Sequence, residues 1–271
     1  MGNVKRNKTY SKKVEEIVEN LSLMDDDLMS RVFDENIPAT QLLLRTILGR
    51  ELEVIFTKGQ WETENPLVTG RCIRLDVFAR DIDGDYFDCE VQRSDAGAIP
   101  KRARFHSAMM DARMLNSGED FQKLRDSYVI FITENDYYHE GKALYQIERK
   151  RENGECFGDG NHIIYVNGRY DGDDDLGQML ADFRRTETTG FNFPELEKGV
   201  RHFKVDKEGK STMCEAVEKY GIEKRNEGRT EGKIESIRAL MKNLKMTAEQ
   251  AMESVGISQS EYDKYLKLLK G

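Results

Sequence analysis

The residues most able to do chemistry are two acids, Asp76 and Glu90, and an amide, Gln92, that follows the second acid. If Asp76 and Glu90 face each other on paired strands, their Cβ atoms lie about 4.5–5.5 Å apart, close enough for one metal ion to contact both. Two adjacent carboxylates repel each other unless they share a cation or a proton. Oxygen ligands suit Mg²⁺ or Mn²⁺, which keep several waters for a phosphate substrate. The pattern is therefore compatible with a magnesium or manganese site.

A β-hairpin would bring the two acids together, and the hydrophobic pattern sets its register. Residues 82–84 suit a three-residue loop with Gly84 in the left-handed conformation. The expected apolar face holds Ile73, Leu75, Val77, Ala79, Phe87, Cys89 and Val91, and the other face holds Arg74, Asp76, Phe78, Asp88, Glu90 and Gln92. The expected cross-strand pairs are Leu75–Val91, Val77–Cys89, Ala79–Phe87, Asp76–Glu90 and Arg74–Gln92. A two-residue turn would set core residues against polar ones.

The same residues also fit an ordinary half-exposed hairpin whose outward face happens to carry acids. Arg74 and Phe78 share that face with the acids, so it is not plainly a solvated surface. Taken by themselves, the residues leave the metal site and the ordinary hairpin equally open.

A basic segment follows the hairpin. Residues 92–113 contain five basic and two acidic side chains, in a chain whose net charge is −8. A phosphodiester substrate needs clustered Lys and Arg near the carboxylates. The expected DNA-binding residues are Arg93, Lys101, Arg102 and Arg104. An ordinary charged helix face is equally compatible with this composition, and His106 could reach the site or simply pack.

The elements that must position these residues alternate between helical and strand character, which is typical of an α/β fold. Helical spacing is found in residues 26–48, with a break near 36–38, and again in residues 100–116 and 173–183. Besides the hairpin, strand character is found in residues 53–57, 128–133 and 162–166. We therefore expect an α/β core with a charged helical C-terminal tail.

The chain is expected to have four parts. They are a flexible N-terminal arm (1–25), the core (26–210), a long charged helix (211–246) and a small two-helix unit (247–271). In the last part, Thr247 with Gln250 and Ser258 with Glu261 match the capping-box pattern of helix starts. This unit resembles a helix-turn-helix. A packing module is at least as compatible, and self-association through these helices would make the chain a homo-oligomer.

Composition limits the other classes of function. The four cysteines and four histidines include no CxxC pair and lie far apart, so a zinc site is not expected and the thiols are expected to be reduced. The sequence contains no apolar run long enough to cross a membrane, and the N-terminus lacks the apolar stretch of a signal peptide. We expect a cytoplasmic protein that does not bind membranes.

Asp76 and the segment Glu90-Val91-Gln92, with residues 93–97 and 101–107 after them, resemble the PD-(D/E)XK nuclease family transposases, also called recombination-promoting nucleases. Later segments are similar to the later part of the same family, namely residues 163–168, residues 173–183 and the Glu-Gly-Arg near-repeat of the tail. The resemblance covers about residues 26–245. The hairpin and the helix after it carry the most specific motifs.

The resemblance implies a mixed central sheet of the restriction-endonuclease-like type and a Mg²⁺- or Mn²⁺-dependent DNA endonuclease linked to recombination or a mobile element. Asp76 and Glu90 would be metal ligands, and the backbone carbonyl of Val91 would be a third. Gln92 stands where the pattern has lysine, and an amide can neither carry a positive charge nor take a proton at neutral pH. Gln92 could instead orient the attacking water.

Two alternatives stay open beside this reading. Asp34 and Glu35, at the end of an early helix, could supply the extra acid that many such nucleases take from a helix, or could be solvated charges. Because the lysine is absent, the chain could also be a catalytically weak or inactive DNA-binding or regulatory protein on a nuclease fold.

Overall fold

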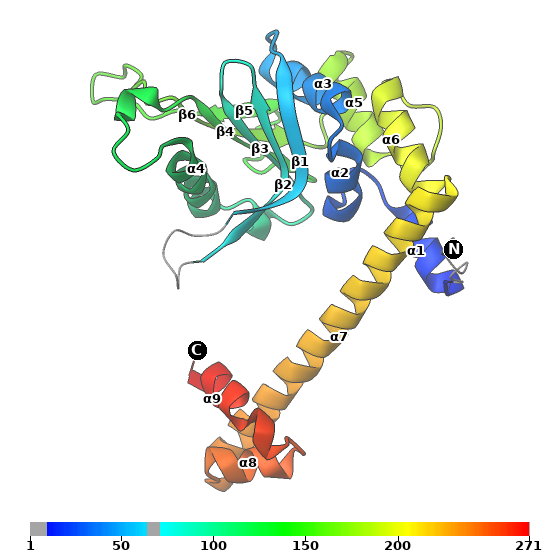
Figure 1. Ribbon diagram of the computed structural model, residues 1–271, viewed down its shortest axis with the longest axis vertical. Coiled ribbons are helices and arrows are strands. Elements are labelled where there is room, and N and C mark those ends of the chain that lie inside the picture. Colours follow the sequence, from blue (N-terminus) through cyan, green and yellow to red (C-terminus); the bar gives the residue numbers. More distant parts are fainter. Residues whose placement is uncertain (1–9, 64–70, 271) are drawn as a thin grey trace, which may run out of the picture. The chain divides into compact units, whose positions relative to one another are not determined.

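The computed structural model describes residues 10–63 and 71–270 (Figure 1). Of the expected N-terminal arm, residues 1–9 lie outside the described residues, and the remainder includes helix α1 (Lys12–Asn20). The chain divides into two compact units, Met1–Cys214 and Glu215–Gly271, and each is described by itself. The residues that the sequence nominates for chemistry all lie in the first unit.

The first unit is built on a mixed sheet, which has six strands in the part of the chain that the structure describes. The strands are β1 (Val54–Thr63), β2 (Ile73–Asp81), β3 (Tyr86–Gln92), β4 (Ser127–Thr133), β5 (Leu144–Ile147) and β6 (Asn161–Asn167). Their order across the sheet is β1-β2-β3-β4-β6-β5. The pairs β1–β2, β2–β3 and β5–β6 are antiparallel, whereas β3–β4 and β4–β6 are parallel. The expected mixed sheet is confirmed, although β1 is longer than its sequence pattern indicates and β5 has no clear pattern.

Helices lie on both faces of this sheet. Helix α4 (Pro100–Met114) is on one face, whereas α2 (Asp26–Phe33) and α3 (Ile37–Leu48) are on the other (Figure 1). Helices α5 (Asp175–Arg184) and α6 (Pro194–Lys204) follow β6 in the chain. The expected helices at 26–48, 100–116 and 173–183 are confirmed.

Local signals in the sequence explain where these helices begin and end. Asn36 accepts the backbone N–H of Ala39 and so caps α3, and Pro38 lies in the first turn, where its missing N–H costs no hydrogen bond. Gly49 ends α3 in the left-handed conformation, with φ of +62°. Pro100 starts α4 in the same way as Pro38 starts α3.

The β2–β3 hairpin has the expected register next to its turn. Val77 pairs with Cys89, and Ala79 pairs with Phe87. Gly84 has φ of +89°, as the three-residue loop requires. The regular ladder ends at Val77–Cys89, so the expected pairs farther from the turn do not form part of it.

The alternation of faces along β2 breaks near Asp76. Leu75 and Phe78 both belong to the hydrophobic cluster beneath α4, although strict alternation would put them on opposite faces. On β1, Gln60 lies between the partners of Leu75 and Val77 and has φ of +48°, which is uncommon for a residue with a Cβ. The expectation that Leu75 and Phe78 face opposite ways is therefore wrong, and the break lies opposite Gln60 of β1.

The core beneath α4 holds this face of the sheet together. Buried side chains of α4 pack against buried side chains of β4 and β6, and they include Ala103, Met109, Met110, Val129, Phe131 and Tyr165. Burying one large apolar side chain contributes about 1.5–3 kcal/mol. Helix α4 is therefore fixed against the sheet on the same face as the polar residues of β3.

The second unit contains α7 (Lys207–Leu244) from Glu215 onward, together with α8 (Ala248–Ser254) and α9 (Tyr262–Lys270). Its buried core consists of Ile237, Ala251, Met252, Ile257 and Tyr265. Helix α7 begins at Lys207, earlier than the pattern from about Met213 indicates. No helix in the described ranges is long and apolar enough to cross a membrane.

Of the two expected capping boxes, the structure forms one. Thr247 and Gln250 exchange side-chain and backbone hydrogen bonds at the start of α8. The Ser258 side chain makes no cap hydrogen bond, and its hydroxyl donates to the Glu261 carboxylate at 2.9 Å. The prediction of a second capping box is therefore wrong.

Candidate active site

Asp76 and Glu90 are joined across the hairpin by their own side chains. The backbone N–H of Asp76 donates to Glu90 Oε1 at 3.0 Å, and the backbone N–H of Val91 donates to Asp76 Oδ2 at 3.2 Å. These two bonds stand just beyond the last regular ladder pair, Val77–Cys89. Asp76 is 7% exposed and Glu90 is 0% exposed. The two acids are therefore buried together and fixed by the backbone of the opposite strand.

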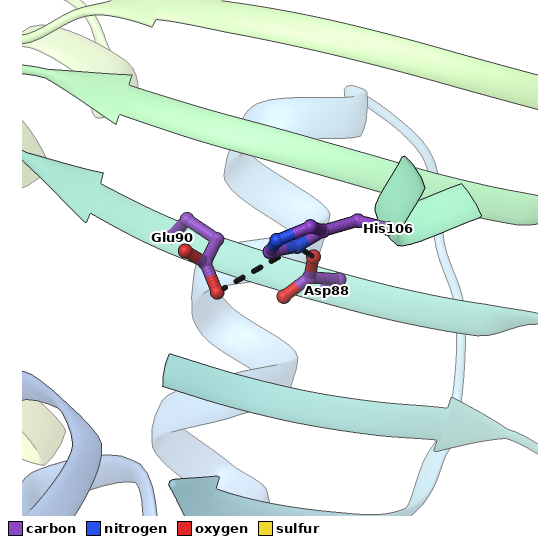
Figure 2. A group of neighbouring side chains, drawn as sticks. All are labelled: Asp88, Glu90 and His106. Carbon is purple, nitrogen blue, oxygen red and sulfur yellow. Dashed lines mark hydrogen bonds and ion pairs between the residues drawn. The ribbon is translucent and has the colours of Figure 1, made fainter. Parts of the chain in front are cut away.

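Glu90 also belongs to a buried cluster with Asp88 and His106 (Figure 2). Asp88 precedes Glu90 on the same face of β3, and His106 reaches down from α4. His106 Nδ1 lies 2.7 Å from Asp88 Oδ2 and 4.0 Å from Glu90 Oε1. One donor atom from each of the three residues lies within 4.8 Å of the others. Asp88 Oδ1 is buried with no hydrogen-bond partner among the residues that the structure describes.

The hydrogen bonds of His106 define its tautomer. Arg102 Nε lies 3.2 Å from His106 Nε2, and a guanidinium can only donate. Nε2 must therefore be the accepting nitrogen, and Nδ1 carries the proton that is donated to Asp88. Burial lowers the pKa of His106, which favours the same neutral imidazole.

The guanidinium of Arg102 lies inside the site. One Nη2 N–H donates to Glu90 Oε2 in a short ion pair. Nη1 donates to the Gly97 carbonyl at 3.1 Å and to Gln92 Oε1 at 3.4 Å. The Arg102 side chain is 34% exposed, so it contacts the buried Glu90 and is also accessible to solvent.

A short loop after β3 holds Gln92 in place. Gln92 Nε2 donates to Glu90 Oε2 at 3.4 Å, and the 3₁₀ turn Asp95–Gly97 passes directly against the amide. A Cβ on Gly97 would lie 1.7 Å from Gln92 Oε1, so any side chain there would force the Gln92 amide to move. The Tyr165 hydroxyl ties the loop to β6 by donating to the Ala98 carbonyl at 2.7 Å.

The electrostatics of the cluster favour the gain of a positive charge. Burial, with the Asp88 carboxylate as the next cause, raises the pKa of Glu90 to about 8. Burial and then Glu90 raise the pKa of Asp76 well above its ordinary value, and burial and then Asp76 do the same for Asp88. With all three carboxylates ionised, the charge of Arg102 leaves two negative charges uncompensated. One divalent cation would neutralise them.

The family profile of the PD-(D/E)XK nuclease family transposases matches residues 30–168, which is just over half of the chain. The chain belongs to this family. The match contains β1 to β6, α4 and every residue of the buried cluster. Comparison with curated proteins gave no match, and comparison with solved structures gave none either.

In this PD-(D/E)XK family member, the donor set fits a hard divalent cation. Asp88 and Glu90 offer carboxylate oxygens, which Mg²⁺ and Mn²⁺ prefer, within 4.8 Å of each other and of a His106 nitrogen, and the Asp76 carboxylate lies beside Glu90. The buried Asp88 Oδ1 has no partner within the described residues that would have to be displaced. The carboxylates fit better than the imidazole. Each imidazole nitrogen of His106 has already used its proton or its one lone pair, whereas a carboxylate oxygen that accepts one hydrogen bond keeps a second lone pair. The resemblance implies the backbone carbonyl of Val91 as a further metal ligand. The contact that the structure shows between Val91 and the acids is made by its backbone N–H, which donates to Asp76 Oδ2.

The four basic residues nominated by the sequence do not share one environment in this PD-(D/E)XK fold. Arg102 lies in the site, whereas Arg93 forms an ion pair with Asp25 at 2.8 Å. Lys101 and Arg104 are exposed on α4. The structure therefore brings Arg102 together with the acids and leaves Lys101 and Arg104 available at the surface of the neighbouring helix.

Asp34 and Glu35 are engaged at the junction of α2 and β1. Lys58 lies 3.1 Å from Asp34 Oδ1 and 3.1 Å from Glu35 Oε1. Asp34 Oδ1 also accepts the backbone N–H of Gly59 at 3.0 Å. These contacts tie the end of α2 to β1, and the structure places neither residue in the buried cluster.

The motif did not identify Asp88 as a site residue, and it did not predict the hydrogen bonds that His106 makes in the site. The alternation of β3 puts Asp88 on the face of Glu90, which was a usable signal. One helical turn separates Arg102 from His106, so both side chains share a side of α4. The packing of α4 against β3 could not be predicted from the sequence, because it depends on contacts between distant parts of the chain.

Proposed function

We propose that the chain is a metal-dependent DNA endonuclease that hydrolyses phosphodiester bonds with Mg²⁺ or Mn²⁺, in recombination or in the movement of a mobile element. The observation that carries this proposal is the buried pair Asp76 and Glu90, each accepting a backbone N–H from the strand of the other. Family membership supports the reaction class, because the family is one of nucleases.

Each residue of the cluster has a part in this proposal. Asp76, Glu90 and Asp88 would hold the cation, since their buried carboxylates carry the charge that a cation would neutralise. The bound ion would supply a water of lowered pKa and a positive charge for the phosphate. Gln92 would orient the attacking water, because its amide is fixed by Glu90, Arg102 and the loop at Gly97.

DNA would approach from the side of α4. Arg102 is partly exposed, and Lys101 and Arg104 extend positive charge along the same helix. Contacts of this kind position a phosphate backbone without reading its sequence. We therefore propose DNA as the partner of this face.

A second candidate is a nuclease-fold protein that binds DNA without cutting it. The ion pair between Arg102 and Glu90 favours this alternative, because a cation that binds Glu90 must share or displace that contact. The absence of a lysine at position 92 favours it as well.

Nicking of a supercoiled plasmid by purified protein distinguishes the two candidates. We expect nicking that requires Mg²⁺ or Mn²⁺ and that falls at least about 100-fold in Asp76→Asn and in Glu90→Gln. Glu152→Gln, which neutralises an exposed acid in a loop, is the matched control and should cut normally. DNA binding by folded wild-type protein with no cutting in either metal would refute the endonuclease and favour the binding protein.

A further inference from the structure

We propose that Arg102 supplies, from α4, the positive charge that the lysine of the family pattern would supply from β3, and that Asp88 and His106 hold it in place. This inference rests on the proposed nuclease function. It makes Arg102 a catalytic residue that touches the reacting phosphate. Asp88 and His106 are positioning residues for Arg102. Asp88 can have this role and also be a metal ligand.

The position of the guanidinium is the first support. It contacts Gln92 Oε1, the amide that stands in the place of the lysine, and it contacts Glu90, the acid of the same motif. A positive group therefore lies at the motif although β3 itself carries none there. An arginine presents its charge on a rigid planar fork that suits phosphate oxygens.

The hydrogen bonds of the guanidinium are the second support. Its five N–H groups include one on Nε and two on each terminal nitrogen. His106 accepts from Nε, Gln92 and Gly97 accept from Nη1, and Glu90 accepts from Nη2. The remaining N–H of Nη2 has no acceptor within residues 10–63 and 71–270. With the side chain 34% exposed, that N–H can donate to a phosphate oxygen.

The chain from Asp88 to Arg102 is the third support. Asp88 accepts the Nδ1 proton of His106, which leaves Nε2 free to accept from Arg102 Nε. The opposite tautomer would set an N–H of His106 against an N–H of Arg102. Asp88 thus sets the orientation of the arginine through the histidine, in the way that a carboxylate sets a catalytic imidazole.

The test combines cleavage of a DNA duplex with Mn²⁺ affinity measured by calorimetry in the absence of DNA. Arg102→Ala should cut at least about 100-fold more slowly, since a positive charge is lost from the transition state. The same variant should bind Mn²⁺ about tenfold more tightly or better, because a charge that repels the ion is gone. Arg113→Ala removes an exposed arginine from the last turn of α4 and should change neither property.

A second substitution separates charge from architecture. In the Arg102→Ala background, Gln92→Lys returns a positive charge from β3 and should restore at least about a tenth of the lost cleavage while weakening Mn²⁺ binding again. If Arg102→Ala does not fold, Arg102→Lys and Arg102→Gln take its place. The lysine variant should retain cleavage and the glutamine variant should lose it.

The positioning role has its own test. His106→Gln can accept from Arg102 and donate to Asp88, so it should keep most of kcat, whereas His106→Leu should lower kcat with little change in KM. Equal kcat in the leucine and glutamine variants would overturn the positioning role.

The remaining outcomes also decide the matter. Unchanged or faster cleavage by Arg102→Ala, beside a wild type that cuts, would overturn the inference and leave the nuclease intact. Loss of both cleavage and Mn²⁺ binding, without recovery by Gln92→Lys, would show a structural arginine and overturn it as well. A wild type that does not cut would refute the proposed function itself, and the catalytic role of Arg102 with it.

Discussion

The Glu90 carboxylate accepts the backbone N–H of Asp76 at 3.0 Å, at the point where the regular β2–β3 ladder has ended. A ladder carbonyl would normally take that N–H. Here the side chain of one acid takes the backbone donor of the other acid, and Asp76 does the same for Val91. The end of the ladder is therefore what lets two buried carboxylates face each other.

Neutralising one acid should separate stability from function. Asp76→Asn keeps the shape and removes a repulsion with Glu90, so the metal-free protein should be at least as stable as wild type. The variant should lose most of the stabilisation that Mn²⁺ gives, which for wild type is about 2.7 kcal/mol at a metal concentration of about 100 times Kd. Thermal unfolding with and without Mn²⁺ measures both effects. An undiminished shift in Tm with Mn²⁺ would show that Asp76 is not a ligand.

Metal-free stability should depend on pH through Glu90. Its pKa is raised from 4.5 to about 8 by burial, so the folded protein keeps a proton that the unfolded chain releases. The stabilisation is fully present below about pH 4.5 and is lost as the pH rises to about 8. Urea unfolding across this range should show a falling free energy of unfolding that is less steep in Glu90→Gln. Identical slopes for the two proteins would contradict the assignment.

A side chain at Gly97 should displace the Gln92 amide. Gly97→Ala would place a Cβ 1.7 Å from Gln92 Oε1, so the amide and its contacts with Arg102 and Glu90 must shift. We expect a loss of cleavage of at least about tenfold and a loss of stability of about 1–3 kcal/mol from overpacking. Gly221→Ala, at an open position of α7, is the control and should be neutral or stabilising. Normal cleavage by Gly97→Ala would show that Gln92 needs no fixed position.

The second unit offers a test of its capping box. Thr247→Ala should destabilise α8 by about 1 kcal/mol, because the Gln250 N–H loses its acceptor. Ser258→Ala should cost less than about 0.5 kcal/mol, since Ser258 caps no helix. Amide hydrogen exchange at the start of α8 reports the local free energy. Equal effects of the two substitutions would contradict the distinction.

Local pattern predicted the part of the site that depends on neighbours in sequence. The Val77–Cys89 pair and the left-handed Gly84 followed from the alternation and the turn, and the structure confirms both. The β2–β3 pairing stops after Val77, next to the point where Gln60 of β1 adopts a left-handed backbone, and no signal in the hairpin indicates either feature.

The rest of the site depends on packing between distant segments. Glu90 lies in a strand whose other neighbour, β4, runs parallel, so a long connection separates the two strands in sequence. His106 reaches Asp88 because the apolar residues of α4 dock against β4 and β6. Apolar spacing predicted the helix itself. It did not predict which polar side chains of that helix would face the sheet.

The most direct test of the account is a crystal of the wild-type protein soaked in Mn²⁺ and measured at the manganese absorption edge. The account predicts an anomalous peak within bonding distance of carboxylate oxygens of both Asp76 and Glu90, and no such peak in Glu90→Gln. A well-diffracting crystal with no peak between these two residues, or with the same peak in Glu90→Gln, would contradict it.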